Sequence, residues 1–142
     1  MKFKKLGKKL IIPVAMCMIL AGGVIQSFAN NSGDRDYNFY FSRWGDTEYT
    51  DGRAKNDKTS SYMKCKELGG NYSYKGTVVA SHRGGYTELE GTPSYTFKRG
   101  TVKFMANYVK ERNFTAASIK ARMSMNPVNV IASGSWSPDS VR

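Results

Sequence analysis

The sequence predicts an all-β protein, a single antiparallel β-sandwich of about seven strands that follows an N-terminal signal peptide. Apolar residues after residue 30 recur at every second position, which is the period of a strand with one buried face. Turn-forming residues separate these runs at intervals of about 8 to 12 residues, as in antiparallel sandwiches and barrels. The best helical composition, Asn107–Met123, is broken at Asn113 and Thr115, where we expect a turn between two strands.

Residues 1–29 are predicted to be the signal peptide. Five lysines precede an uncharged stretch, Leu10–Ile25, and the small residues Ser27 and Ala29 precede a cut between Ala29 and Asn30. An uncleaved membrane anchor is the alternative, but proline and glycine shorten the apolar run below the roughly 20 residues that a spanning helix needs. Residues 30–142 then form one secreted domain of 113 residues (142 minus 29), enough for a single core.

The charge balance argues against a nucleic-acid partner. The chain has 22 Lys and Arg and 11 Asp and Glu, and five of the lysines lie in residues 1–29. The secreted part therefore keeps 17 basic against 11 acidic residues, a net charge of +6 rather than +11. Such an excess suits loose attraction to an anionic cell-wall polymer or membrane surface better than binding to a nucleic acid.

The first predicted strands lie within residues 37–44, 60–68 and 72–82. In the first run Tyr37, Phe39 and Phe41 share the inward face, and Tyr40 and Trp44 have the opposite parity and should face outward. In the second run, one face of the strand carries Ser61, Met63, Cys65 and Glu67, and the opposite face carries Tyr62, Lys64 and Lys66. The highly charged segment Gly45–Thr59 is expected to be a surface loop.

Four further strands are expected within residues 94–100, 100–111, 117–125 and 127–136. The longest of them, within residues 100–111, should bury the face that carries Phe104 and leave Lys103 on the other face. The substitution Phe104→Ala should therefore be strongly destabilising. The next two runs alternate in the same way, and a Lys98-Arg99-Gly100 turn ends the first of the four. The predicted buried sets are Val102, Phe104, Ala106 and Tyr108; Ile119, Ala121 and Met123; and Val128, Val130, Ala132 and Trp136.

The sequence offers no catalytic or metal-binding constellation, so we expect a protein that is not an enzyme and that needs no cofactor or metal. Cys65 is the single cysteine after residue 29 and is expected to be a small buried hydrophobe. His82 is the only histidine and is expected at a strand end in a loop. The acidic residues Asp34, Asp36, Asp46, Glu48, Asp51 and Asp57 lack the spacing of the helical calcium loop.

Aromatic residues beside cations give the best candidate binding site. Such pairs can stack on sugars or settle among lipid headgroups, although strand alternation sends about half of the aromatic residues into the core. The candidate binding residues are Arg43 with Trp44, and Lys98 and Arg99 with Tyr95.

Four strings carry a resemblance to known families: "GRAKNDKTSSYMKC", "VVASH", "YTFKRGTVKFMANYV" and "ASGSWSPDSV". In this order they resemble small, largely uncharacterised secreted proteins of Gram-positive bacteria, which have a signal peptide, an all-β body and a Gly-x-Trp near the carboxyl end. The chain is also similar to the lactococcin-type bacteriocins, whose secreted β-sandwich acts against neighbouring cells, but it is longer and lacks their Gly- and Trp-rich start. The resemblance implies no catalytic residue.

Three functional classes follow from these observations. The first is a secreted, non-catalytic protein that associates with the cell envelope or another extracellular anionic surface. The second is a bacteriocin-like antibacterial effector, which should inhibit the growth of related bacteria. The third, a secreted enzyme, would need a carboxylate pair or histidine dyad that the sequence does not supply. We expect the first class.

Overall fold

The structure, a computed structural model, describes residues 31–141, and the predicted signal peptide with its cleavage site lies outside them. Ten strands and no α-helix form this described part: β1 (Arg35–Phe41), β2 (Asp46–Tyr49), β3 (Arg53–Ala54), β4 (Ser61–Leu68), β5 (Tyr74–His82), β6 (Gly85–Thr87), β7 (Tyr95–Phe97), β8 (Val102–Met105), β9 (Ala116–Met123) and β10 (Val130–Ser137). Nowhere in residues 31–141 is there a helix long and apolar enough to cross a membrane.

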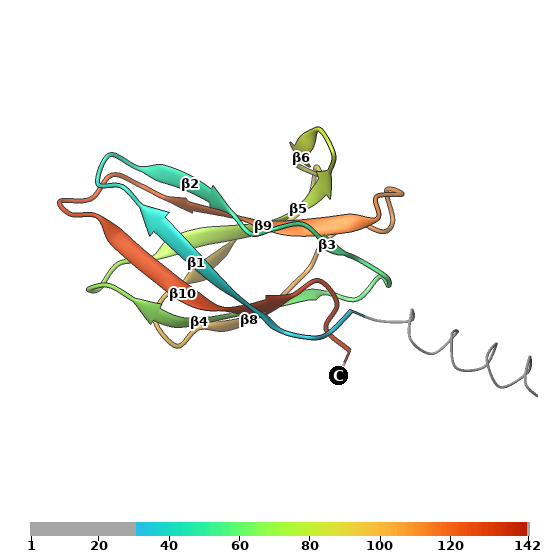
Figure 1. Ribbon diagram of the computed structural model, residues 1–142, viewed down its shortest axis with the longest axis horizontal. Helices are drawn as coiled ribbons and strands as arrows, with labels where there is room; N and C mark the ends of the chain where they lie inside the picture. The colour runs from blue at the N-terminus through green and yellow to red at the C-terminus, as the bar shows by residue number, and fades with distance from the viewer. Residues whose placement is uncertain (1–30, 142) are drawn as a thin grey trace, which may run out of the picture.

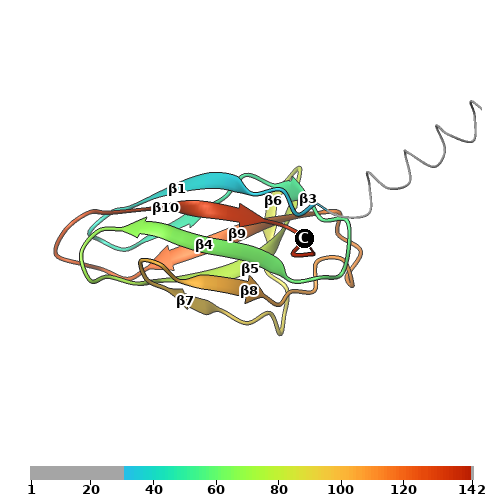
Figure 2. The same cartoon turned by 90° about the horizontal axis from the view of Figure 1, so that it is seen from below.

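The strands form two antiparallel sheets that pack face to face, which confirms the predicted sandwich (Figures 1 and 2). One sheet has the order β1-β10-β4-β8. The other has the order β2-β9-β5-β6, with β3 also paired to β9 and β7 also paired to β5. Neighbouring strands are often far apart in sequence, so the fold depends on long-range pairing.

Side-chain alternation builds the core as predicted on four long strands. The side of β4 that carries Met63 and Cys65 faces inward, and Tyr40 and Trp44 are exposed. Gly76 and Gly134 lie where a larger side chain would not fit against a paired strand of the same sheet, because an added Cβ would lie 2.8 Å from the Phe97 ring or 1.9 Å from the Lys64 carbonyl oxygen. The predicted inward residues that are buried are Tyr37, Phe39, Phe41, Ile119, Ala121, Met123, Val130, Ala132 and Trp136.

The prediction for residues 100–111 was wrong in both face and length. Strand β8 has only four residues, and Met105 is buried, whereas Phe104 is 58% exposed and Val102 and Tyr108 are exposed as well. Both parities of this segment carry apolar residues, so alternation alone could not choose between them. Pairing with β4 decides it: Ser61 faces Met105 and holds it inward, and Phe104 lies outside against the Tyr62 ring, with centroids 5.6 Å apart.

Two further expectations need correction. The segment Gly45–Thr59 is not one loop, because its backbone pairs with β9 and forms β2 and β3, which with β6 raise the number of strands above seven. Its charged side chains hid this short edge pairing from the hydrophobic pattern. Val128 is exposed rather than inward, since β10 begins only at Val130.

A buried ion pair closes the end of the sandwich where the described chain starts and finishes. Lys55 Nζ donates to Asp139 Oδ1 at 2.7 Å and to the Thr59 carbonyl oxygen at 2.6 Å. Asp139 Oδ2 accepts hydrogen bonds from the backbone amides of Asn31 at 2.7 Å and Asn56 at 3.1 Å. Both charged side chains are fully buried, so the pair joins the start of the described chain, the segment after β3 and the segment after β10.

Candidate functional site

Four connections come together at the end of the sandwich opposite to the C-terminus, and we call this surface the loop end (Figure 1). Strand register places them there, because Phe41 pairs with Val130, Leu68 with Ala132 and Tyr74 with Phe97. The loop end consists of the β1–β2 turn (42–45), the β4–β5 loop (69–73), the β7–β8 turn (98–101) and the β9–β10 loop (124–129). It therefore collects Arg43, Trp44, Lys98 and Arg99, four of the five predicted binding residues.

The β1–β2 turn presents Trp44 to solvent. The Gly45 amide donates to the Ser42 carbonyl oxygen at 3.2 Å, and Gly45 has a φ of 90°, which favours glycine. Asp46 Oδ2 accepts a hydrogen bond from the Ser42 amide at 3.3 Å. The Trp44 side chain is 69% exposed, and the Arg43 guanidinium lies 4.6 Å from its ring centroid, a cation–π contact. The turn thus displays an aromatic ring and a cation as one unit.

Two asparagines fix this turn to the neighbouring β9–β10 loop. The Arg43 amide donates to Asn129 Oδ1 at 2.9 Å, and the Asn126 amide donates to the Arg43 carbonyl oxygen at 2.8 Å. Asn129 Nδ2 also donates to the Tyr40 hydroxyl at 2.8 Å. Both backbone polar groups of Arg43 are therefore bonded across the loop end. This clamp holds Trp44 in place before any partner arrives, which lowers the entropic cost of binding.

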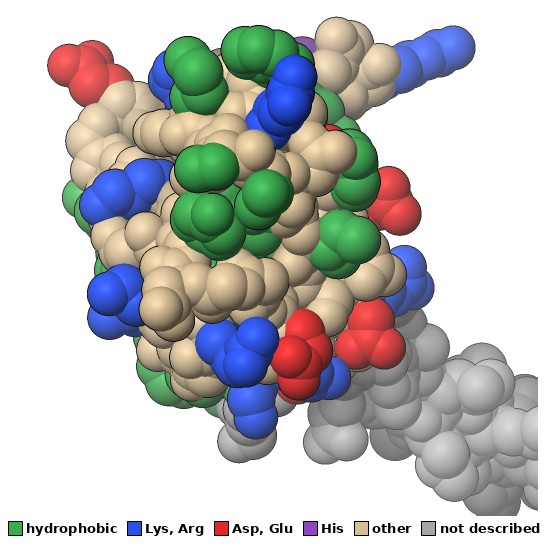
Figure 3. Space-filling view, turned by 90° about the vertical axis from the view of Figure 1, so that its left-hand side faces the viewer, with side chains coloured by type: hydrophobic (Ala, Val, Ile, Leu, Met, Phe, Trp, Pro, Cys, Tyr) green, Lys and Arg blue, Asp and Glu red, His purple; other side chains and the backbone are tan. Residues whose placement is uncertain are grey.

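Apolar side chains extend the surface beyond Trp44. Met125 is 67% exposed, and Val128 and Ile131 are more than half exposed. Figure 3 views the molecule from the loop end and shows hydrophobic side chains together in the middle of this face, with Lys and Arg side chains and some Asp and Glu side chains around them. Neighbouring exposed apolar side chains on a domain of this size are typical of a contact surface.

Basic side chains surround this apolar group. Lys75 of β5 and Arg122 of β9 lie directly opposite each other in the register and both point away from the core. Like charges in this position repel, so the pair costs stability. Arg99 donates to the Leu68 carbonyl oxygen at 2.9 Å and lies 3.7 Å from Glu67. In the described part of the chain, Lys75, Lys98 and Arg122 carry no ion pair that would neutralise them.

Tyr95 does not join the loop end as an exposed ring. It pairs with Gly76 on the inward side of β7 and packs partly buried against the core. Its hydroxyl accepts a hydrogen bond from the Ala106 amide at 2.9 Å. This contact gives Tyr95 a structural role. Tyr95 therefore does not form one exposed group with Lys98 and Arg99, as the sequence predicted.

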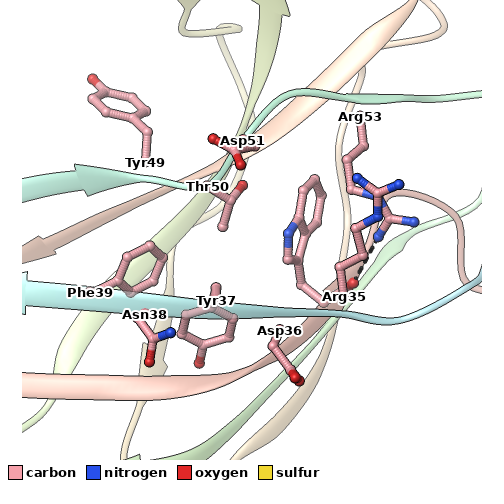
Figure 4. Close-up of a pocket in the computed structure, with 10 residues that line it drawn as sticks. Arg35, Asp36, Tyr37, Asn38, Phe39, Tyr49, Thr50, Asp51 and Arg53 are labelled. Carbon is pink, nitrogen blue, oxygen red and sulfur yellow. Dashed lines mark hydrogen bonds between the residues drawn. The ribbon is translucent and has the colours of Figure 1, made fainter.

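A second concave feature lies where the edges of the two sheets meet, between β1 and the β2–β3 segment (Figure 4). It encloses about 180 Å³ beside Arg35, Arg53 and Trp136. Arg53 donates to the Trp136 carbonyl oxygen at 3.0 Å and to the Gly33 carbonyl oxygen at 2.7 Å, and its burial and the nearby Arg35 lower the pKa of the guanidinium. Arg53 also donates to Asn31 Oδ1 at 3.2 Å, so its guanidinium ties the segment before β1 to β10.

The reactive side chains lie apart from the loop end or inside the core. Cys65 is fully buried, and burial raises the pKa of its thiol, so the nucleophilic thiolate is disfavoured. His82 lies at a strand end, as predicted, but as the last residue of β5 paired with Gly85 rather than in a loop, and its Nε2 is 2.8 Å from the Thr87 hydroxyl. Residues 31–141 contain no group of three or more His, Cys, Asp or Glu side chains that could hold a metal ion.

Sequence reasoning missed the residues of the β9–β10 loop and the cation pair behind it. Met125 and Val128 flank the turn-forming pair Asn126 and Pro127, a pattern that could have marked an exposed apolar loop. Lys75 and Arg122 become one charged site only through the pairing of β5 with β9, for which the sequence carries no local signal.

Comparison of the chain with curated proteins and with solved structures gave no match. Comparison with protein-family models gave one match, which covers residues 25–140 and so most of the chain. The match includes every strand of the sandwich and the whole loop end. The chain therefore belongs to the family described as "Protein of unknown function (DUF2712)".

Proposed function

We propose that this protein is a secreted, non-catalytic binding protein that associates with an anionic surface of the cell envelope through its loop end. The observation that carries the proposal is the clamped Arg43–Trp44 unit, an exposed ring and cation held by Asn126 and Asn129. Secretion, predicted from residues 1–29, would bring this surface to the outside of the cell.

The charges of the loop end support an anionic partner. Lys75, Lys98 and Arg122 have no ion pair among the described residues. A positive field of this kind attracts anionic polymers and headgroups and weakens as salt screens it over about 8 Å at physiological ionic strength. An exposed ring adds a contact that depends much less on salt.

Co-sedimentation with purified cell envelopes at low and high salt tests this proposal, using protein recovered from culture medium. The double variant Lys98→Ala/Arg99→Ala should lower binding mainly at low salt, and Trp44→Ala should lower it at both salt concentrations. The variant Lys58→Ala/Arg83→Ala is the matched control, because it removes two exposed cations from the opposite end and should bind like the wild type. Wild-type protein that stays in the supernatant under both conditions would contradict the proposal.

A bacteriocin-like antibacterial effector, secreted by a Gram-positive bacterium, is the second candidate. The same exposed Trp44 and Met125 favour it, since a surface that engages an envelope could also act on the envelope of a neighbouring cell. A spot assay of the purified protein on related bacteria separates the two functions. Clear zones that disappear with Trp44→Ala would favour the effector, and undisturbed growth at concentrations that saturate envelope binding would favour the binding protein.

A further inference from the structure

We propose that the anionic surface is a phospholipid bilayer and that the loop end inserts Trp44, Met125 and Val128 among the lipid headgroups. This inference rests on the function proposed above and narrows its partner. A cell-wall polymer, which presents phosphates and hydroxyl groups, can pair with cations and stack on a ring, but it gains little from contact with methionine or valine. The hydrocarbon boundary of a bilayer gains from all three side chains, because each removes apolar surface from water.

The three side chains lie at the extreme of the molecule. Trp44 belongs to the β1–β2 turn, and Met125 and Val128 belong to the β9–β10 loop that is bonded to it through Asn126 and Asn129. A shallow hollow lined by Arg43, Trp44, Met125, Asn126 and Pro127 joins the two loops into one surface. Figure 3 shows that such apolar side chains occupy the middle of this face.

The cations stand behind the apolar tip, where headgroup phosphates would lie. Arg122 precedes Met125 by three residues. At about 3.3 Å per residue, Arg122 therefore lies at most roughly 10 Å farther from the tip than Met125 does. Interfacial protein segments bury their apolar face to a depth of about 5 to 10 Å. The facing Lys75 and Arg122, which repel each other in the free protein, would both gain from a phosphate placed between them.

The orientation of the molecule agrees with this mode of binding. The loop end and the C-terminus are at opposite ends of the long axis (Figures 1 and 2), so docking tip-first leaves the buried Lys55–Asp139 pair at the far end. The clamp keeps Trp44 and Met125 exposed together in the absence of lipid. Asn129 is therefore a positioning residue for insertion, because its side chain holds Arg43 and Tyr40 without itself being part of the tip.

Tryptophan fluorescence provides a direct test, because the chain has two tryptophans and the other one, Trp136, is buried. The probe is vesicles of equal parts phosphatidylcholine and phosphatidylglycerol, with pure phosphatidylcholine vesicles as the neutral comparison. We expect a blue shift and quenching by bromine-labelled acyl chains with the anionic vesicles and a much smaller change with the neutral ones. Trp44→Phe should remove both signals.

The variant Met125→Ser/Val128→Ser tests the apolar part of the contact. It should weaken partition into anionic vesicles about tenfold or more and leave binding to lipid-free cell wall unchanged. Phe104→Ser is the matched control, since Phe104 is similarly exposed but lies on the outer face of β8, away from the loop end. Asn129→Ala should weaken partition as well, with unchanged thermal unfolding as the check that the sandwich is intact.

Each outcome separates the two proposals. Quenching of Trp44 in anionic vesicles, with the expected loss in the Met125 and Val128 variant, supports insertion. Binding to lipid-free cell wall without binding to vesicles overturns the bilayer and leaves the envelope-binding function standing. Binding to vesicles without quenching overturns insertion, and binding to neither material overturns both proposals.

Discussion

Replacing Asp139 with asparagine should destabilise the sandwich by about 3 kcal/mol. The carboxylate is fully buried and accepts hydrogen bonds from the Lys55 ammonium at 2.7 Å, from the Asn31 amide at 2.7 Å and from the Asn56 amide at 3.1 Å. The amide side chain of asparagine keeps one acceptor oxygen but turns an NH₂ group toward one set of these donors. The variant also leaves the Lys55 charge buried without its partner.

The size of the effect comes from that unpaired ammonium. Breaking a buried ion pair by removing one partner costs about 3 to 5 kcal/mol, because the remaining charge stays out of water. Asp57 lies 3.7 Å from Lys55 Nζ and is partly exposed, so it partly compensates for the lost carboxylate. We therefore expect a destabilisation at the lower end of this range. A loss of about 3 kcal/mol in a domain of this size lowers the thermal midpoint by roughly 10 °C or more.

The same carboxylate should make stability depend on pH. Burial by itself raises the pKa of Asp139, but hydrogen bonds from Lys55 and from the amides of Asn31 and Asn56 outweigh burial and leave the pKa below its ordinary value. The unfolded chain therefore takes up this proton at a higher pH than the folded protein. The stabilisation is complete above the ordinary aspartate pKa of about 3.9 and is lost as the pH falls from there through the folded pKa. The difference in urea midpoint between wild type and Asp139→Asn should shrink below about pH 4.

Two variants control the interpretation. Adding Lys55→Met to Asp139→Asn removes the unpaired charge, so the double variant should be less destabilised than the sum of the two single changes. Asp36→Asn breaks an exposed pair with Lys66, at 3.4 Å, and should cost less than about 1 kcal/mol. Equal urea midpoints for Asp139→Asn and Asp36→Asn would refute the reasoning about the buried pair.

Three further predictions concern the packing of the sandwich, each measured by urea unfolding. Met105→Ala should cost about 2 to 5 kcal/mol and Phe104→Ala less than about 1 kcal/mol, and the reverse order would contradict the assigned faces of β8. Gly134→Ala should destabilise by about 1 to 3 kcal/mol or more, because its Cβ would lie 1.9 Å from the Lys64 carbonyl oxygen; an unchanged midpoint would show that the strands can separate there. Asn113→Val should cost about 1 to 2 kcal/mol, since the residue has a φ of 65°, whereas Asn113→Gly should be nearly neutral.

The sequence by itself determined the class of the fold and most of its inward faces. Where one parity is apolar and the other polar, as with Ile119 and Ala121 against Lys120, period two identifies both the strand and its buried side. The turn at Asn113 followed from local residue types, and the exposure of Trp44 followed from its parity, although Trp44 lies in the turn after β1 rather than in the strand. Four of the five candidate binding residues lie together at the loop end, although the sequence proposed them as two separate groups.

Only the tertiary structure decided features that depend on a partner strand. Val102–Met105 has apolar residues on both sides, so its pairing with β4, and not its own pattern, selected Met105 for the core. Charged residues concealed the short strands β2 and β3, whose pairing comes from the backbone. Lys55 and Asp139 are 84 residues apart, and Arg43 and Asn129 are 86 apart. A local pattern reports the period of one segment, but the order in which strands pair determines which distant side chains meet, and here that order formed both the buried ion pair and the loop end.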